Sequence, residues 1–188
     1  MSPEQPAGKP AGGLISPAQN TWCPGCGNFA VLNAIKAVFG ELIAAGTRRE
    51  DIVVVADIGC SSKIIDYVGV NSFDSLHGRA IPTAVGVKLA NPQLTVVVHI
   101  GDGGAYAEGL EHLLFAAKRN VDLTVIVHDN GVYALTVGQA GPMTPSGYRG
   151  RSTPYGSEST PFNPLELLAV EAVQRAGLVV DDIRGPVV

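Results

Sequence analysis

Three continuous runs of aliphatic residues constrain the fold more than any other feature of this chain. They are IVVVADI (Ile52–Ile58), LTVVVHI (Leu94–Ile100) and LTVIVH (Leu123–His128). Because their apolar residues are continuous rather than alternating, both faces of each strand should be covered, as in parallel sheets. Residues 105–120, between the last two runs, have apolar positions at helical spacing. The sequence therefore predicts an α/β fold, a parallel sheet with helices on both faces.

The rest of the chain divides into an arm, two further helices and a long connection. Residues 1–20 are rich in Pro, Gly, Ala and Ser, which predicts a flexible arm, with residues 21–188 forming one domain. Apolar residues recur at helical spacing from Phe29 to Ala45, and a last helix is predicted from Leu165 to Ala176. Residues 138–164 are dense in Gly, Pro, Ser and Thr, and loops of this length are usually functional or mobile.

Composition narrows the classes of function. Hydrophobic residues make up 46% and charged residues 16%, as in globular proteins, and the net charge of −4 argues against nucleic acid or an anionic membrane as partner. No apolar run approaches the ~20 residues of a membrane span, and the first residues have no apolar signal core. The three cysteines are too few and odd in number for a secreted disulfide framework. We therefore expect a cytoplasmic protein.

A Gly-Asp-Gly segment follows the second apolar run directly. Asp102 stands between Gly101 and Gly103 there, and Asn130 follows the third run in the same way. Ligands of open parallel sheets bind at the carboxyl ends of the strands. The helix expected to begin near Gly104 would offer free backbone N–H groups to an anion. The segment thus predicts either a phosphate site or, more simply, a glycine turn in which Asp102 caps the helix.

A phosphate at this place requires a cation. Two like charges ~4 Å apart repel by about 4 kcal/mol at an effective dielectric constant near 20, whereas a helix terminus contributes only ~0.3–1 kcal/mol. Mg²⁺ suits the site, since it accepts carboxylate, amide, carbonyl and phosphate oxygens. The predicted protein ligands are Asp102, the side-chain oxygen of Asn130 and the backbone carbonyl of Val132.

The three cysteines allow three interpretations. Cys23 and Cys26 form a C-x2-C pair in WCPGC, and Cys60 follows the first apolar run. A thioredoxin-like redox pair should follow a strand, but this pair follows the predicted arm. A structural zinc site is a second reading, with His77 as a possible fourth ligand. The third is an iron–sulfur cluster held by the three thiolates and a ligand from elsewhere.

The order of the motifs resembles a known family. The spacing GDG-x26-N is similar to the diphosphate-and-metal motif of thiamine diphosphate enzymes. CPGCGN, ADIGCSSKI, LHGRAIPTAVGVKLANP, GDG and RNVDLTVIVHDNGVYALTVGQAGPMTP follow one another as in the β subunit of 2-oxoacid:ferredoxin oxidoreductases, over residues 22–164. The resemblance implies a thiamine diphosphate-binding fold, a [4Fe–4S] cluster and CoA-dependent oxidative decarboxylation of a 2-oxoacid such as pyruvate or 2-oxoglutarate, with electrons passing to ferredoxin.

The resemblance also assigns roles by position. It implies that Cys23, Cys26 and Cys60 are cluster ligands and that Asp102, Asn130 and Val132 are Mg²⁺ ligands. Lys63 and His77 would lie on the catalytic side of the cofactor. The predicted cofactor-binding residues are Gly101, Asp102, Gly103, Gly104, Asn130, Val132 and Tyr133.

Two departures from the family pattern shape the expected function. Gly104 stands where many members have an acidic residue, and the family's fourth cysteine belongs to a C-terminal region beyond this chain, which is therefore expected to be C-terminally short. The resemblance implies that the glutamate that activates the cofactor comes from the partner, the α subunit, although Glu108 and Glu111 are available here. The chain is thus expected to be half of an active site. The alternative is a non-catalytic β-like module that binds a partner, with structural cysteines and zinc as the candidate metal.

Overall fold

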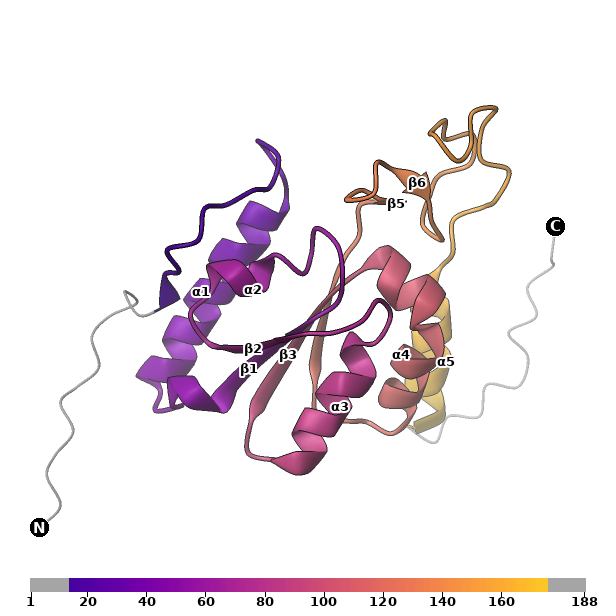
Figure 1. Cartoon of the computed structure of the whole chain (residues 1–188). Helices are drawn as coiled ribbons and strands as arrows, with labels where there is room; N and C mark the ends of the chain where they lie inside the picture. The colour runs from indigo at the N-terminus through magenta and orange to yellow at the C-terminus, as the bar shows by residue number, and fades with distance from the viewer. Residues whose placement is uncertain (1–13, 176–188) are drawn as a thin grey trace, which may run out of the picture.

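A four-stranded parallel sheet lies at the centre of the computed structural model, which describes residues 14–175 (Figure 1). Its strands are β1 (Ile52–Ala56), β2 (Asn71–Asp74), β3 (Thr95–Gly101) and β4 (Thr124–His128). Their order is β2-β1-β3-β4, and all three neighbouring pairs are parallel. Three of the four strands coincide with the predicted apolar runs, so the predicted parallel α/β sheet is confirmed.

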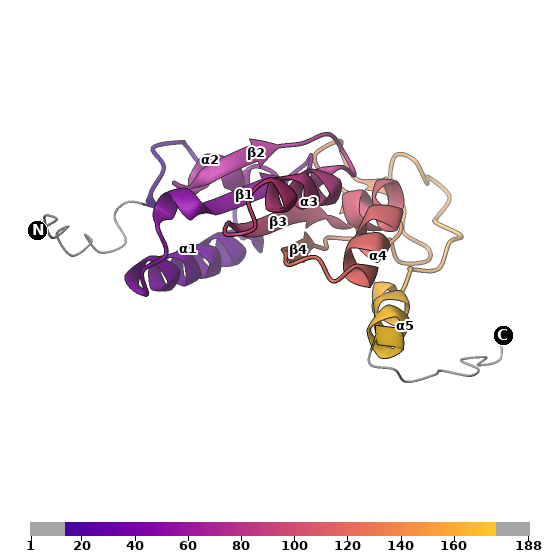
Figure 2. The ribbon, with the colours of Figure 1, turned by 90° about the horizontal axis from the view of Figure 1, so that it is seen from below.

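Helices cover both faces of this sheet, as the continuous apolar runs predicted. One face packs against α1 (Asn28–Ala44) and the short α2 (Ile64–Tyr67), and the other against α3 (Ala80–Ala90) and α4 (Leu110–Lys118). Figure 1 shows the two groups of helices on opposite sides of the strands, and Figure 2 shows α1 and α4 from below. Each core strand contributes alternate side chains to the two apolar clusters.

Alternation along β1 and β3 separates the two clusters. Val54 and Val97 belong to the cluster with α1, whereas Val55 and Val98 belong to the cluster with α3. All four are buried. At ~1.5–3 kcal/mol for a fully buried aliphatic side chain, these clusters make the sheet a rigid base for the loops at its ends.

Some elements have no clear signal in the sequence. β2 has four exposed residues and forms one edge of the sheet, so its polar sequence shows no apolar run. The helix expected over residues 105–120 is interrupted by a π-helical turn, Gly104–Glu108, before α4 begins. A Cβ at Gly109 would lie 2.6 Å from the carbonyl oxygen of Gly78. The segment around residue 78 therefore packs directly against the break in the helix.

The remaining elements lie after β4. A small hairpin joins β5 (Val132–Tyr133) to β6 (Gln139–Ala140) within the long loop, and α5 (Pro164–Arg175) packs against α4. A 3₁₀ turn, Arg49–Asp51, precedes β1. Within residues 14–175, no helix is long and apolar enough to cross a membrane.

Two residues of the arm predicted over residues 1–20 pack against the domain. Leu14 is only 3% exposed and belongs to the α1 cluster, and Ile15 pairs with Val68 in an isolated β-bridge. Leu14 and Ile15 therefore belong to the packed domain, and the boundary predicted at residue 20 is wrong, because the Leu14 side chain is buried in the core despite its Gly- and Pro-rich surroundings. The rest of the predicted arm, residues 1–13, and the tail, 176–188, lie outside the described residues.

Candidate functional site

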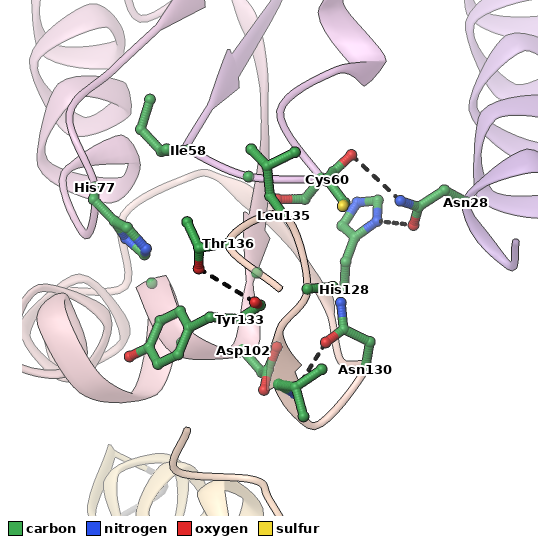
Figure 3. A pocket seen from close by; sticks show the side chains of 17 residues that line it. Asn28, Ile58, Cys60, His77, Asp102, His128, Asn130, Tyr133, Leu135 and Thr136 are labelled. Carbon is green, nitrogen blue, oxygen red and sulfur yellow. Dashed lines mark hydrogen bonds between the residues drawn. The ribbon is translucent and has the colours of Figure 1, made fainter. Parts of the chain in front are cut away.

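A cleft of about 540 Å³ opens where β1, β3 and β4 end (Figure 3). Gly101 pairs with His128 in the sheet, so the Gly-Asp-Gly segment and the Asp-Asn segment leave adjacent strands at the same edge. His77 also lines the cleft, from the loop before α3. The cleft brings together every predicted cofactor-binding residue: Gly101, Asp102, Gly103, Gly104, Asn130, Val132 and Tyr133.

Asp102 presents a buried oxygen without a partner. The residue is 2% exposed, and its Oδ2 atom has no hydrogen bond. Burial raises the pKa of Asp102, and the nearby charge of Asp129 raises it further. The Asn130 side-chain oxygen accepts a hydrogen bond from the backbone N–H of Val132, 3.0 Å away, which shapes the turn beside Asp102. An orphaned carboxylate oxygen beside an amide and a carbonyl oxygen fits the all-oxygen coordination of Mg²⁺.

Tyr133 closes over the Gly-Asp-Gly segment. A Cβ at Gly103 would overlap the ring of Tyr133, so only glycine fits there. The Tyr133 hydroxyl donates to Oε1 of Glu108 across 3.0 Å, and its ring meets the His77 ring edge-on at 5.9 Å between centroids. Burial and the Glu108 carboxylate raise the pKa of Tyr133 to about 12. The Tyr133 hydroxyl therefore stays protonated near pH 7, and the ring is held against the Gly-Asp-Gly segment.

Asp57, which the sequence analysis did not single out, lies behind His77. It is fully buried, and its Oδ2 atom lies 3.1 Å from Nδ1 of His77. A Cβ at Gly104 would overlap this carboxylate, which explains in physical terms why residue 104 has no side chain here. Asp57 directly follows β1, but it lies inside the predicted run Ile52–Ile58, so the sequence pattern did not mark it as a residue at a strand end.

Two buried histidines connect the cleft to the cysteine segment. Nδ1 of His99 lies 2.8 Å from Nε2 of His128, and Nδ1 of His128 lies 2.8 Å from Oδ1 of Asn28. Nδ2 of Asn28 donates to the carbonyl of Cys60 at 3.3 Å, as Figure 3 shows. Burial lowers the pKa of His99 to about 3 and that of His128 to about 4, so both rings are neutral near pH 7.

The direction of the hydrogen bonds in the series His99–His128–Asn28 follows from the bond that Asn28 makes to Cys60. Because the Asn28 amide nitrogen donates to Cys60, its oxygen must accept from Nδ1–H of His128. A neutral His128 then has a free lone pair on Nε2, which accepts from Nδ1–H of His99. Nε2 of His99 is left as a buried acceptor without a partner. The hydrogen bonds of this series therefore all run in one direction, with His99 donating to His128 and His128 donating to Asn28.

The cysteines lie in a second hollow that shares a wall with the cleft. It is lined by Cys23, Cys26, Cys60 and Lys63. Cys23 is exposed and the other two thiols are partly buried. Burial raises the pKa of the Cys60 thiol, while the charge of Lys63 acts in the opposite direction. The Lys63 amino group donates to Oγ1 of Thr21 at 3.0 Å, so this predicted catalytic residue lies beside the thiols rather than among the residues lining the cleft.

The donor set of this hollow suits a thiolate-bound metal or cluster only in part. Three thiols share the hollow, but within residues 14–175 no group of three or more His, Cys, Asp or Glu side chains is arranged to hold a metal ion. The Trp22 indole N–H donates to the Cys60 carbonyl at 2.7 Å and ties the two cysteine segments together. The segments are thus adjacent, with the thiols not drawn around one centre.

The two glutamates noted as available near the site, Glu108 and Glu111, both have partners of their own. Glu108 accepts the Tyr133 hydrogen bond, and Glu111 lies 3.4 Å from Nη1 of Arg79 and 3.2 Å from Nε2 of His112. Neither is among the residues that line the cleft.

Comparison with known proteins identifies the domain. Residues 57–182 match the family described as thiamine pyrophosphate enzyme, C-terminal TPP binding domain. The chain is 46% identical over 155 residues to the 2-oxoacid:ferredoxin oxidoreductase subunit beta of a Sulfolobus species, covering 81% of this chain and 50% of that protein. It is 42% identical over 163 residues to the 2-oxoglutarate oxidoreductase subunit KorB of Mycobacterium tuberculosis, covering 87% of this chain and 43% of that protein.

A solved structure agrees with the sequence relatives. The fold matches, with a TM-score of 0.81 and 36% identity, a 2-oxoglutarate:ferredoxin oxidoreductase from Magnetococcus marinus with 2-oxoglutarate, coenzyme A and succinyl-CoA bound. That match covers 87% of this chain and 55% of the other. The chain thus spans about half the length of the relatives it matches. The resemblance drawn from the motifs is confirmed.

Proposed function

The chain belongs to the thiamine pyrophosphate enzyme family and resembles the β subunits of its 2-oxoacid:ferredoxin oxidoreductases, and from this premise we propose that it binds thiamine diphosphate through Mg²⁺ in the cleft at the strand ends. The observation that carries the proposal is the orphaned Oδ2 of Asp102, buried beside Asn130 and Val132. A dianionic diphosphate would be repelled by Asp102 without a bridging cation.

Different residues of the cleft would bind the metal ion and contact the cofactor. Asp102, the Asn130 side chain and the Val132 carbonyl would hold Mg²⁺, while the Tyr133 ring packs directly against the backbone of Gly103 beside them. When bound, thiamine diphosphate supplies a nucleophilic carbon and an electron sink for decarboxylation of a 2-oxoacid. His77 lies on the opposite side of the cleft from Asn130 in Figure 3, where it can exchange a hydrogen bond with bound substrate or cofactor.

The cysteine hollow would serve electron transfer. We propose that Cys23, Cys26 and Cys60 hold an iron–sulfur cluster of the [4Fe–4S] type, with Lys63 close by. Since the chain offers three thiols, the fourth iron would depend on another ligand, and the cluster should be labile and sensitive to oxygen. Electrons would leave for ferredoxin. The alternative is a non-catalytic β-like module that binds a partner, with structural cysteines and zinc as the candidate metal.

A partner subunit would complete the site. Glu108 and Glu111 are both engaged elsewhere, so an α subunit is the proposed source of the carboxylate that activates the cofactor. It would also complete the binding of coenzyme A and the 2-oxoacid. The chain alone should therefore bind thiamine diphosphate weakly and oxidise no 2-oxoacid.

Anaerobic purification tests the enzyme against the binding module. The proposal predicts broad visible absorption from iron and sulfide, a change to a three-iron electron paramagnetic resonance signal after brief exposure to air, and 2-oxoacid-dependent reduction of ferredoxin only when the partner is present. Zinc without iron, together with no activity in the complete complex, would support the module. An air-stable four-iron cluster in the isolated chain would show that this chain itself supplies a fourth ligand to the cluster.

A further inference from the structure

Asp57 is a buried acid that the proposed metal and cofactor ligands leave unused. Its side chain is fully buried at the end of β1, and neither carboxylate oxygen has a hydrogen bond of good geometry. Burying a charged carboxylate without a hydrogen-bonding or charged partner costs several kcal/mol. Its presence at the edge of a cleft therefore suggests a functional role. The side chain beside it is that of His77, whose Nδ1 lies 3.1 Å from Oδ2 of Asp57 and 3.8 Å from Oε2 of Glu108 and has no hydrogen bond to either.

The surroundings of Asp57 oppose the effect of burial, which prevails and raises the pKa of its carboxyl group above the ordinary value. Burial raises the pKa of Asp57, whereas the backbone N–H groups of Ile58, Gly78 and Arg79 and the imidazole of His77 lower it. In its ionised form a carboxylate can only accept hydrogen bonds, so a hydrogen bond formed across this 3.1 Å contact would be donated by Nδ1–H of His77. Nε2, the ring nitrogen on the other side from Asp57, then has a free lone pair in a ring that lines the cleft.

Gly104 makes room for this carboxylate. A Cβ at position 104 would overlap Oδ2 of Asp57 and would lie 3.1 Å from Cγ1 of Ile100. Positions 57 and 104 therefore compete for one small volume beside His77. A side chain at position 104 can enter that volume only if residue 57 leaves it, and an aspartate there would direct its carboxylate into the space that the Asp57 side chain vacates.

We propose that Asp57 is a positioning residue that fixes His77 as the Nδ1–H tautomer, leaving Nε2 to accept a hydrogen bond from a donor group of the molecule bound in the cleft. The geometry further implies that an aspartate at position 104 can replace Asp57 when residue 57 is glycine. The tautomer is a property of the chain itself, and only its use by a bound cofactor or substrate rests on the proposed function.

Nuclear magnetic resonance of ¹⁵N-histidine-labelled full chain reports this tautomer directly. Spectra are taken above the ordinary histidine pKa of about 6.5, with the His77 signals assigned through His77→Gln. The variants are Asp57→Asn, Asp57→Gly and the double variant Asp57→Gly/Gly104→Asp. Asp66→Asn, at an exposed acid on α2, is the matched control.

The expected results are a wild-type His77 with its proton on Nδ1, loss of that form in both single variants, and its return in the double variant. Asp66→Asn should match wild type. An unchanged tautomer in Asp57→Asn would overturn the proposal. So would a double variant that folds without the wild-type tautomer or fails to fold, because position 104 must accept the carboxylate.

Thiamine diphosphate titration of the same variants separates this inference from the proposed function. Weaker binding by Asp57→Asn, with recovery in the double variant, would connect the tautomer to the cofactor. No binding by wild type, together with the expected tautomer changes, would refute the cofactor assignment and leave the Asp57–His77 pair standing.

Discussion

The cleft and the cysteine hollow share a wall but are built in different ways. The cleft rests on groups that the sheet buries: Asp57 and Asp102 are nearly inaccessible, and Gly103 and Gly104 admit neighbouring side chains with no space left for a Cβ. The cysteine hollow is formed by turns before α1 and after β1, and its thiols are exposed or half-buried. Rigid strands thus define one site, while turns define the other.

This difference indicates how much of each site the chain can form by itself. Buried polar groups keep their geometry because packing leaves them no alternative, so the cleft is already shaped for a ligand. Exposed thiols on turns have no such constraint, and a metal, cluster or partner would have to draw them together. Asn28 is the exception, since it bonds to His128 on one side and to Cys60 on the other.

The largest effect should follow loss of the Asp102 carboxylate. Asp102→Ala should abolish Mg²⁺-dependent thiamine diphosphate binding, exceeding the ~10–100-fold loss typical of outer-shell changes at metal sites. Calorimetric titration of the full chain and of its assembled complex measures the affinity. Asp66→Ala, at an exposed acid, is the control and should bind as wild type does. Unchanged affinity in Asp102→Ala would show that Asp102 does not bind the diphosphate through Mg²⁺.

Acid should destabilise the fold through the two buried histidines. Their folded-state pKa values of about 3 and about 4 lie below the unfolded value, so the unfolded chain binds more protons below pH ~6.5. Stability is then full above pH ~6.5 and falls with decreasing pH, by up to about 1.4 kcal/mol per pH unit for each histidine.

Denaturant unfolding at a series of pH values measures this slope. In His99→Gln/His128→Gln the slope between pH ~6.5 and ~4 should become shallower, and His112→Gln, at a histidine outside both hollows, is the control. A double variant with the wild-type slope would mean that other groups cause the acid sensitivity.

A methyl group at Gly103 should disturb the cleft selectively. Gly103→Ala places a Cβ in the ring of Tyr133, and such overpacking costs about 1–3 kcal/mol and should displace the ring from Glu108. Gly40→Ala in α1, where no atom lies within 4 Å of the new Cβ, should instead stabilise the fold by about 0.5–1 kcal/mol. Equal unfolding free energies for the two variants would contradict the close fit of the cleft.

The smallest effect tests the link between the two regions. Asn28→Ala removes hydrogen bonds to His128 and Cys60, and because Asn28 is half-buried, water can replace it at a cost of about 0.5–1.5 kcal/mol for each bond. Cys60 should then react faster with a thiol reagent, and the fluorescence of Trp22, which bonds to the Cys60 carbonyl, should change. Unaltered reactivity and fluorescence would show that the two regions are independent.

The sequence predicted the residues whose positions follow from strand ends. Asp102 and Asn130 come directly after apolar runs, and parallel strands bring such ends to one edge, so their meeting required no tertiary detail. Asp57 was missed because the predicted run Ile52–Ile58 includes it, and its partner His77 comes from a loop that the strand pattern does not place. The buried histidines were missed as well, since they lie within apolar runs.

Other features depend on contacts that a local pattern does not contain. The break at Gly109 arises because the carbonyl of Gly78 packs against it, and the helical spacing continues through it unchanged. β2 is an exposed edge strand whose pairing with β1, rather than its composition, makes it a strand. Lys63 was expected near the reacting groups, but the turn after β1 places it beside the thiols.

Titration of the full chain with thiamine diphosphate, in Mg²⁺ and then in a chelator, tests the central claim most directly. Thiamine without its diphosphate is the matched ligand. Because the unpartnered oxygen of Asp102 can face a diphosphate only through a cation, binding should require both Mg²⁺ and the diphosphate. Equal binding in the chelator, or equal binding of thiamine, would contradict the account.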